Sequence, residues 1–254
     1  MLRFASLGSG SKGNATIIES GKTRILLDCG FSVVETERRL AKLDHSTLDS
    51  LSAILVTHEH SDHVSGVGRL SRKYNLPVYA TAGTYQSCKD NDFSTILYIN
   101  PDKPFEIDDL HVQPFPVPHD AREPCQFVFS DGAAKLGILT DVGSETPHII
   151  ETLHALDALM LECNYDEAML MQGSYPYKLK MRVAGNYGHL DNRQSSALLK
   201  KLDQSKLKHL VGMHLSEKNN RIEYANSALC EALGCEQDWL LIASQSDGFG
   251  WREI

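Results

Sequence analysis

The stretch THEHSDH, residues 57–63, concentrates metal-binding side chains directly after an apolar run. Neutral imidazole and carboxylate are ligands that Zn²⁺, Mn²⁺ and Fe²⁺ take in proteins. Because side chains alternate along a strand, His58 and His60 point the same way and can hold one ion together. The chain then turns, so Asp62 and His63 can reach a second ion. The alternative is a solvated polar loop in which the histidines cluster by chance.

Three more candidate ligands follow apolar runs further along the chain: His119, Asp141 and His214. Each alone is more often a capping or turn residue, but together they complete a two-metal site. The ligands expected at one ion are His58, His60 and His119. Those expected at the other are Asp62, His63 and His214, with Asp141 bridging the two. This donor set predicts two divalent ions and accepts Zn, Mn or Fe.

The elements that must position these ligands alternate in type along the chain. Strands are predicted at residues 2–7, 15–19, 23–28, 51–57, 78–80, 111–116, 125–130, 135–140, 158–162, 209–213 and 239–243. Helices are predicted at residues 33–43, 64–74, 148–156, 193–202 and 223–233. This order, strands in a meander and then alternating with helices, occurs twice and predicts an α/β fold, a four-layer αββα sandwich. No repeat or linker is visible, so residues 1–254 are expected to form a single domain.

Composition indicates a globular protein of a reducing compartment. The six cysteines of the 254 residues are scattered without a CxxC pair, which favours free thiols and a cytoplasmic location. Apolar runs fall short of the roughly 18–20 residues that a membrane span needs, and the start shows no secretory pattern. We therefore expect no membrane partner. The net charge of −8 disfavours a broad basic surface for nucleic acid.

The pattern H-x-H-x-D-H, with a spaced His, an Asp after an apolar strand and a late His, resembles the metallo-β-lactamase-fold superfamily. Its αββα sandwich agrees with the predicted elements. Flavodiiron-type oxidoreductases differ in carrying Glu in place of His60, and the commonest zinc β-lactamases carry Cys in place of Asp141. Glyoxalase-II-like enzymes share the ligands, so a metal-dependent thioesterase or lactonase acting on a small metabolite is an alternative function. A non-catalytic metal-binding interaction protein is a second one, disfavoured because structural zinc sites are usually closed and rich in Cys.

Three later stretches, LMLECNYDEAML, NYGHLDN and LVGMHLSEKNN, resemble the nucleic-acid-processing phosphodiesterases that include tRNase Z. That resemblance implies that Glu162 and His189 form a pair beside the metals. His189 would bind the scissile phosphate or protonate the leaving oxygen, and Glu162 would orient its imidazole. The motifs GSGSKGNAT, VPHDAREP, GHLDN and HLSEKNN more closely resemble the YycJ/WalJ family, which is associated with 5′-to-3′ exonuclease activity on DNA. That family usually has GHLSN, so Asp191 stands where Ser is expected.

Two polar stretches could receive a substrate phosphate: the loop GSGSKGN and the segment after His214. Small residues let backbone N–H groups approach a phosphate, and hydroxyl or amide side chains add donors. The alternatives are a plain hairpin turn and a polar loop that opens a helix. The candidate phosphate contacts are Ser9, Ser11, Asn14, Ser216, Lys218, Asn219 and Asn220.

Taken together, the sequence predicts a binuclear metal-dependent phosphodiesterase acting on nucleic acid, and the family resemblance implies a 5′-to-3′ DNA exonuclease. A hydroxide held between the metals, next to Asp62, would attack phosphorus in line. The catalytic residues expected are Asp62, Glu162 and His189. The acidic balance argues for a small footprint at a DNA end. No long exosite arm is evident, so substrate choice must come from the chain's own loops, a protein partner or a second copy of the chain.

Overall fold

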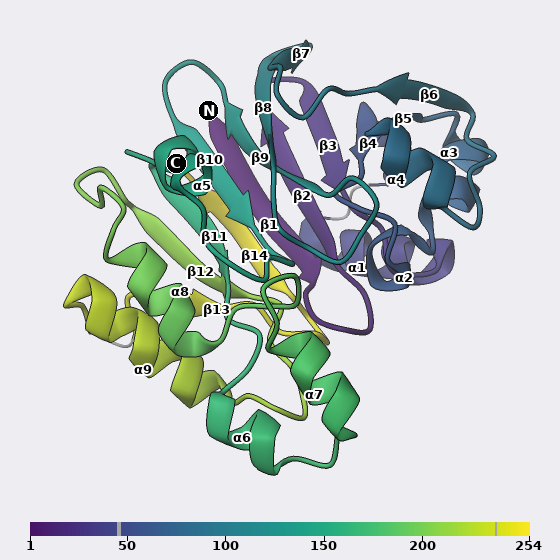
Figure 1. The fold of residues 1–254 in the computed structure, drawn as a ribbon. Coiled ribbons are helices and arrows are strands. Elements are labelled where there is room, and N and C mark those ends of the chain that lie inside the picture. Colours follow the sequence, from purple (N-terminus) through teal and green to yellow (C-terminus); the bar gives the residue numbers. More distant parts are fainter. Residues whose placement is uncertain (45–46, 237) are drawn as a thin grey trace.

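Two mixed sheets form the centre of the computed structural model, which describes residues 1–44, 47–236 and 238–254 (Figure 1). Within these residues each sheet has seven strands. The order in the first sheet is β14-β1-β2-β3-β4-β5-β6. Its strands are β1 (Leu2–Gly8), β2 (Ala15–Ser20), β3 (Thr23–Leu27), β4 (Ala53–Leu55), β5 (Pro77–Ala80), β6 (Thr95–Tyr98) and β14 (Phe249–Glu253).

The second sheet repeats the plan of the first. Its order is β13-β12-β11-β10-β9-β8-β7. Its strands are β7 (Phe105–Ile107), β8 (Leu110–Pro116), β9 (Cys125–Ser130), β10 (Lys135–Leu139), β11 (Ala158–Glu162), β12 (His209–Met213) and β13 (Leu241–Ile242). In each sheet an antiparallel part is followed by a parallel part, β3 to β6 in the first and β10 to β13 in the second. Because parallel strands end at the same edge of a sheet, the loops that follow them gather there.

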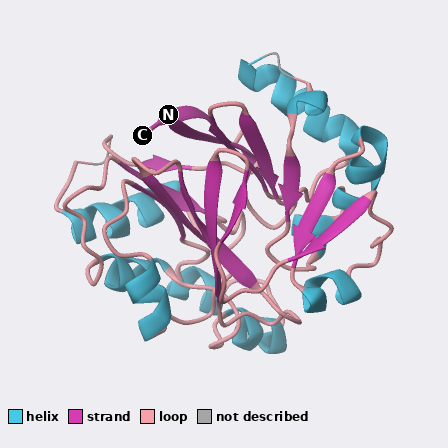
Figure 2. Ribbon diagram, turned by 90° about the horizontal axis from the view of Figure 1, so that it is seen from above, coloured by secondary structure: helices cyan, strands magenta, loops and turns pink. Residues whose placement is uncertain are grey.

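Helices cover the outer face of each sheet, so the strands lie between two helical layers (Figure 2). Helices α1 and α3 pack on the first sheet through Leu40 and Leu70, which share a buried cluster with Ile17 and Ile54. The helices before the second sheet are α1 (Val33–Asp44), η1 (Leu48–Ser50), α2 (Ser61–Val64), α3 (Val67–Tyr74) and α4 (Ala82–Ser87). Those that follow are α5 (Pro147–Thr152), α6 (Glu167–Gln172), α7 (Tyr177–Val183), α8 (Asn192–Leu199) and α9 (Ile222–Leu233).

The core has one layer between the sheets and one under each set of helices. Phe4 of β1 and Phe127 of β9 belong to the same fully buried cluster, which joins the two sheets. Beneath the second sheet, helices α5, α8 and α9 contribute Ile149, Leu198 and Leu229 to a separate cluster. The predicted αββα sandwich is therefore confirmed.

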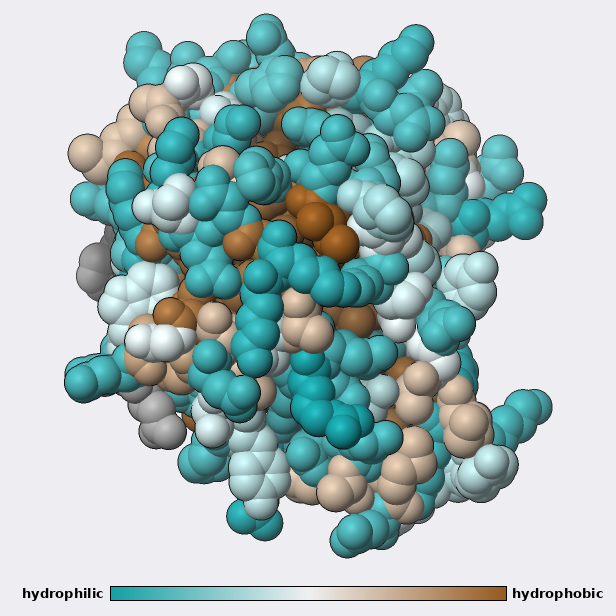
Figure 3. Space-filling view, turned by 60° about the vertical axis from the view of Figure 1, so that its left-hand side comes forward, coloured by the Kyte–Doolittle hydropathy of each residue, from teal (hydrophilic) through white to brown (hydrophobic). Residues whose placement is uncertain are grey.

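On the face drawn in Figure 3, apolar side chains gather near the middle and hydrophilic ones surround them.

Most predicted elements are present, with changed bounds. The helix predicted at 64–74 is α3, which begins at Val67, and a separate short helix, α2, ends at Val64 before it. Ser65 and Gly66 lie between the two helices. A Cβ on Gly66 would lie 2.1 Å from the carbonyl oxygen of Phe31, so the chain passes too close to its neighbour for any side chain there. The strand predicted at 51–57 is β4 alone, because residues 56–60 turn into the loop that carries the histidines.

Several short elements were not predicted from the sequence: η1, α2, α4, α6, α7, β6, β7 and β14. Helix α7 has no buried residue, so it lacks the apolar periodicity by which a helix is found in a sequence. No helix within the described residues is long and apolar enough to cross a membrane.

Candidate metal centre

The histidines of the loop after β4 form a first group with His119 of the loop after β8. The candidate ligand atoms of His58, His60 and His119 all lie within 4.8 Å of one another. His60 Nδ1 lies 3.2 Å from His119 Nε2. Each ring has its other nitrogen near an outer oxygen: His58 Nδ1 is 2.9 Å from Thr57 Oγ1 and His119 Nδ1 is 3.0 Å from the carbonyl oxygen of Gly188. Such outer contacts fix the ring orientation of metal-binding histidines, so this group is built to hold an ion.

A second group lies next to the first and joins helix α2 to the end of β12. Candidate ligand atoms of Asp62, His63 and His214 also lie within 4.8 Å of one another. Asp62 Oδ2 is 3.5 Å from His63 Nε2 and 3.5 Å from His214 Nε2. The outer nitrogen of the His63 ring, Nδ1, is 2.8 Å from Asp28 Oδ2. The structure therefore brings together two three-residue groups with the membership expected from the sequence.

Asp141 lies between the two groups, where a bridging ligand would be. Its Oδ2 is 3.1 Å from His63 Nε2 and its Oδ1 is 3.1 Å from His214 Nδ1. It also forms a compact cluster with His58 and His63. Asp141 and His214 follow their strands in the left-handed region, with φ of 52° and 54°. This conformation is energetically unfavourable for non-glycine residues, and it is often retained where function requires a side chain in a fixed position.

Buried atoms without a hydrogen-bond partner test whether these residues fit a metal. Within the described residues they include His58 Nε2, Asp141 Oδ2 and both ring nitrogens of His214, although Asp141 lies within ion-pair distance of His63 and His214. An unsatisfied buried polar atom costs about 1–3 kcal/mol, so such a concentration is unfavourable unless a ligand binds there. Imidazole nitrogens and carboxylate oxygens are the donors that divalent transition metals take. The residues fit two such ions.

The charges of the two groups differ. Burial lowers the pKa of His58 and of His119, so both rings stay neutral, which is the form that binds a metal. Burial also opposes protonation of His63 and His214, but Asp141 and the carboxylates around it outweigh burial and raise both pKa values well above the usual one. These carboxylates thus create a negative site that either protons or a cation can neutralise.

Asp28 at the end of β3 was missed by the sequence analysis. Its Oδ1 accepts a hydrogen bond of 2.9 Å from the Thr57 backbone N–H, and its Oδ2 accepts one of 2.9 Å from the Thr57 hydroxyl. The same carboxylate faces His63. Gly30 lets this loop approach α2, because a Cβ there would lie 1.8 Å from the Asp62 carbonyl oxygen. The only signal of Asp28 in the sequence is that an acidic residue directly follows an apolar strand, which is common at turns.

Glu162 and His189 lie together beside the two groups. His189 Nδ1 is 2.8 Å from Glu162 Oε1, which leaves Nε2 for the cavity. Glu162 is fully buried and also accepts hydrogen bonds from the backbone N–H groups of Asp141, Val142 and Leu190. Burial opposes ionisation of Glu162, but the facing imidazoles of His189 and His214 prevail and lower its pKa. In turn burial opposes the charge on His189, yet Glu162 raises the pKa of its imidazole.

A cavity of about 190 Å³ opens over this site. It is lined by His60, Asp62, Asp141, His189 and His214, together with residues of α7. Metal-dependent hydrolysis needs metal ligands, a group that can transfer a proton and space for the substrate, and this cavity has all three.

Most of the predicted phosphate contacts lie inside the loops. Ser9 Oγ accepts a hydrogen bond of 2.8 Å from the His214 backbone N–H, and Asn14 Nδ2 is 3.0 Å from His63 Nε2. Asn220 Nδ2 donates to the Cys163 carbonyl oxygen at 2.8 Å. Ser216 and Asn219 are also buried, and Asn219 bonds to Ser216. These five side chains support the loops, in keeping with the structural alternatives that the sequence leaves open, and phosphate contact by them stays a prediction.

The two remaining predicted contacts are more open. Ser11 lines the cavity over the candidate metals. The Lys218 ammonium lies 5.6 Å from the centroid of the Tyr175 ring. Phosphate contact by Ser11 and Lys218 stays a prediction. Ser9, Ser216 and Asn220 also line a second cavity of about 460 Å³, which does not include the candidate ligands.

Asp191 is the N-cap of α8. The family that the motifs resemble usually has Ser at this position. Asp191 Oδ1 accepts a hydrogen bond of 2.7 Å from the Gln194 backbone N–H, and Gln194 Oε1 accepts one of 2.9 Å from the Asp191 backbone N–H. Ser and Asp are both good N-caps, so this position keeps its structural role with either residue.

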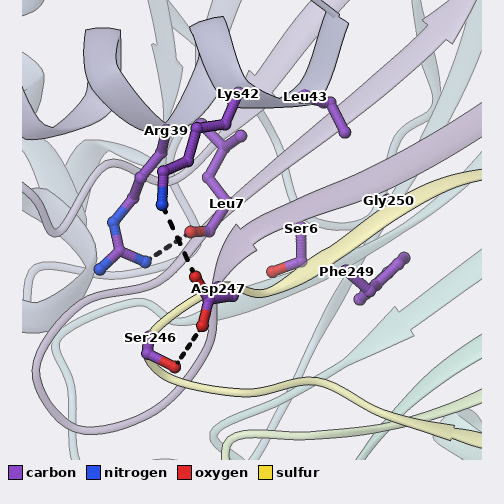
Figure 4. A pocket seen from close by; sticks show the side chains of 9 residues that line it. All are labelled: Ser6, Leu7, Arg39, Lys42, Leu43, Ser246, Asp247, Phe249 and Gly250. Carbon is purple, nitrogen blue, oxygen red and sulfur yellow. Dashed lines mark hydrogen bonds and ion pairs between the residues drawn. The ribbon is translucent and has the colours of Figure 1, made fainter.

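A third cavity of about 170 Å³, at the end of β1, contains none of the candidate residues (Figure 4). The Arg39 guanidinium, which lines this cavity, donates hydrogen bonds to the carbonyl oxygens of Leu7 and Gln245 at 2.6 Å and 3.0 Å. Lys42 lies 3.8 Å from Asp247. These cations serve to join α1 to the ends of β1 and β14, so the chemistry is concentrated in the cavity beside His189.

Comparison with known proteins agrees with this geometry. Residues 23–215 match the family described as "Beta-lactamase superfamily domain". The chain is 34% identical to "Exodeoxyribonuclease YycJ" of Bacillus anthracis, over 91% of this chain and 89% of that protein. It is 33% identical to "Exodeoxyribonuclease WalJ" of Streptococcus pneumoniae, over 91% of this chain and 88% of that protein.

The fold is shared with solved structures of lower identity. The metallo-β-lactamase fold protein YhfI from Bacillus subtilis superposes with a TM-score of 0.76 at 18% identity, over 100% of both chains. The αββα sandwich seen here is thus the metallo-β-lactamase fold. The chain belongs to the beta-lactamase superfamily and, within it, to the family of YycJ and WalJ.

Proposed function

We propose that this chain is a two-metal phosphodiesterase that shortens DNA from its 5′ end. The observation that carries the proposal is the cavity beside His189, onto which two groups of candidate ligands and a paired imidazole converge. A structural metal site would need neither the open cavity nor the imidazole.

The ligands of this proposal are divided between two ions. One ion is held by His58, His60 and His119 and the other by Asp62, His63 and His214, with Asp141 between them. When bound, two such ions would supply a nucleophilic hydroxide, since a metal can lower the pKa of its bound water from 15.7 to about 7, and would neutralise charge on the phosphate. Zn, Mn or Fe would serve.

The chain's own residues position the substrate and move its protons. The Asp62 carboxylate lines the cavity, where it accepts the proton of the attacking water. His189 Nε2 faces the same cavity and donates a proton to the departing 3′ oxygen. Glu162, bonded to Nδ1 of that ring, keeps the imidazole in the orientation that this transfer requires.

The choice of substrate is supported by the relatives. Both YycJ and WalJ are named exodeoxyribonucleases, which favours DNA over a small metabolite. The direction of degradation comes from the resemblance of the motifs to that family. A cytoplasmic location is part of the same proposal, in keeping with six free cysteines.

The proposal is tested first with small substrates. The purified protein loaded with Mn²⁺ is expected to hydrolyse bis(p-nitrophenyl) phosphate and to leave S-acyl glutathione intact. The Asp141→Ala variant should have no metal-dependent turnover. Thioester cleavage without phosphodiester cleavage would instead favour the thioesterase alternative, and wild-type turnover in the variant would contradict the two-metal reading.

Direction is tested with DNA labelled at its 3′ end. A 5′-phosphorylated strand should shorten progressively while it keeps the label, since residues leave from the other end. Immediate release of the 3′ label would overturn the proposed direction, and a single internal cut would show an endonuclease.

A further inference from the structure

A short excursion of the chain between β11 and α8 overhangs the candidate metal centre. We call residues 171–187, which include α7, the α7 segment; α6 and α7 project together at one end of the molecule (Figure 1). Leu179, Arg182 and Val183 of the segment line the same cavity as His189. Yet α7 contains no buried residue. A helix that adds nothing to the core but borders a reactive cavity is placed to contact substrate.

The segment exposes several aromatic and apolar side chains. The side chains of Tyr177 and Tyr187 are 76% and 64% exposed, and those of Met171 and Met181 are 41% and 47% exposed. The segment also contains Tyr175, so it holds three of the nine tyrosines of the chain. Exposed apolar groups gathered next to a cavity mark binding surfaces more often than scattered ones do.

The charge of the segment is opposite to that of the whole chain. Its Lys and Arg residues are Lys178, Lys180 and Arg182, and it contains no Asp or Glu, whereas the chain has a net charge of −8. Arg182 forms an ion pair with Asp120 of the loop after β8, so the attraction of the segment for a polyanion rests on Lys178 and Lys180. A local cluster of cations, not the total charge, governs the approach of a polyanion. Aromatic rings interleaved with cations match nucleic acid, which presents bases to stack and phosphates to pair.

Backbone contacts fix the segment to the candidate site. The His189 N–H donates to the Val183 carbonyl oxygen at 2.9 Å, and the Asp120 N–H donates to that of Tyr187 at 2.9 Å. Ser144 Oγ donates to the Asn186 carbonyl oxygen at 3.1 Å. These bonds connect the segment to the loops that carry His119, Asp141 and His189. A strand bound on the segment would therefore have a defined position relative to the reacting groups.

We infer that the α7 segment is a platform on which unpaired bases of a nucleic-acid strand stack while its phosphodiester enters the cavity beside His189. The inference rests on the proposed function, since it names how that substrate is held. Tyr177 and Tyr187 supply stacking surfaces, and Lys178 attracts the backbone. Stacking accepts every base, so binding should not depend on sequence, and it requires bases that are free of a complementary strand.

The test is equilibrium binding of a fluorescent oligothymidylate to the metal-loaded protein. Phosphorothioate linkages make the strand resist hydrolysis, so that binding is measured alone. The Tyr177→Ala, Tyr187→Ala double variant should bind at least roughly fivefold more weakly, because each stacked base contributes an energy that corresponds to about a fivefold change or more. Tyr177→Phe keeps the ring and should bind like wild type. Lys178→Gln should reduce the dependence of Kd on salt.

The matched control is Tyr224→Ala, which removes a tyrosine that is 45% exposed on α9, outside the segment. Equal Kd values for the double variant and wild type would overturn the platform, and so would equal affinity for a duplex and a single strand. If the double variant lost binding to anionic lipid vesicles while its binding to the oligonucleotide stayed unchanged, the segment would be a membrane-binding surface, and the platform would be overturned as well. If the wild-type protein fails to hydrolyse bis(p-nitrophenyl) phosphate, the proposed function itself fails, which this separate readout distinguishes.

Discussion

At the scale of single residues, polar groups that are not ligands themselves contact the ring nitrogens of the candidate histidine ligands that face away from the proposed metals. Asp28 faces the outer nitrogen of His63, as the Gly188 carbonyl oxygen faces that of His119. Such partners orient a ring and raise its basicity, so they affect metal affinity without touching the ion. They also show why the two groups keep their geometry in a buried, electrostatically costly site.

Replacing Asp28 with Asn should weaken one metal site and spare the other. Asn tolerates the left-handed backbone that Asp28 adopts, with φ of 60°, so the fold should persist. We expect about 10- to 100-fold weaker binding at the Asp62–His63–His214 site, measured by calorimetric titration with Mn²⁺. The control is Asp109→Asn, an exposed carboxylate that accepts a hydrogen bond from the Lys22 N–H. An unchanged affinity in Asp28→Asn would remove Asp28 from the site.

His189→Ala should slow DNA cleavage by roughly 10²–10⁴, the usual span for general acid–base help. Its metal content should stay that of wild type, because His189 is not assigned to either ion. His154→Ala, at an exposed imidazole 3.9 Å from Asp203, is the matched control. A wild-type rate in His189→Ala would exclude the imidazole from the reaction.

The residue types of the ligands could be predicted, whereas their supports could not. Histidines and carboxylates in dense, regular spacing are costly unless they bind something, so His58 and Asp62 stand out in the sequence. Asp28 does not, since a single acid after a strand is ordinary. Ser9 and Asn220 look like exposed loop residues in the sequence, and only the fold shows that they are buried.

At the scale of elements, helix α8 begins at Asn192, close behind His189, so its cap helps to fix the loop that carries His189. Asp191 caps the helix, and its neighbours Leu190 and His189 both contact Glu162. Asp191→Ala should lower the free energy of unfolding by about 0.5–2 kcal/mol, as measured in urea. Asp191→Ser should stay close to wild type, because Ser caps as well as Asp does. Equal losses in the two variants would mean that capping is not what Asp191 contributes.

Most of the strands were predictable because apolar runs of the right length mark them, and the ligands follow at the ends of several of these strands. The elements that escaped prediction are short, and two of them, α6 and α7, lie between β11 and α8. Helix α7 has no buried residue, so nothing in its periodicity distinguishes it from a polar loop. The helix that borders the cavity beside His189 is therefore among the elements that the sequence specifies least clearly.

At the scale of the whole molecule, the net charge of −8 and a nucleic-acid substrate are compatible. Several of the acids lie in the candidate metal centre, where two divalent ions would neutralise them, and the α7 segment supplies local cations. The local potential decides where a phosphate binds. A small footprint at a strand end suits this charge distribution better than wrapping along a duplex.

Metal removal should destabilise the entire fold. Ions that bind only the folded state stabilise it by about 2.7 kcal/mol at a free concentration of 100 Kd. For a chain of this size, that predicts a fall in Tm of roughly 5 °C or more after treatment with a chelator. Added Mn²⁺ should restore the original Tm in a thermal unfolding experiment. An identical Tm with chelator and with Mn²⁺ would show that metal binding is not linked to folding.

The central claim is that two metal ions share one site, and anomalous scattering from a crystal soaked in Mn²⁺ tests it most directly. We predict two peaks per chain, about 3.5–4 Å apart. One should lie among His58, His60 and His119 and the other among Asp62, His63 and His214, with Asp141 between them. A single peak, or two peaks outside these residues, would contradict the account.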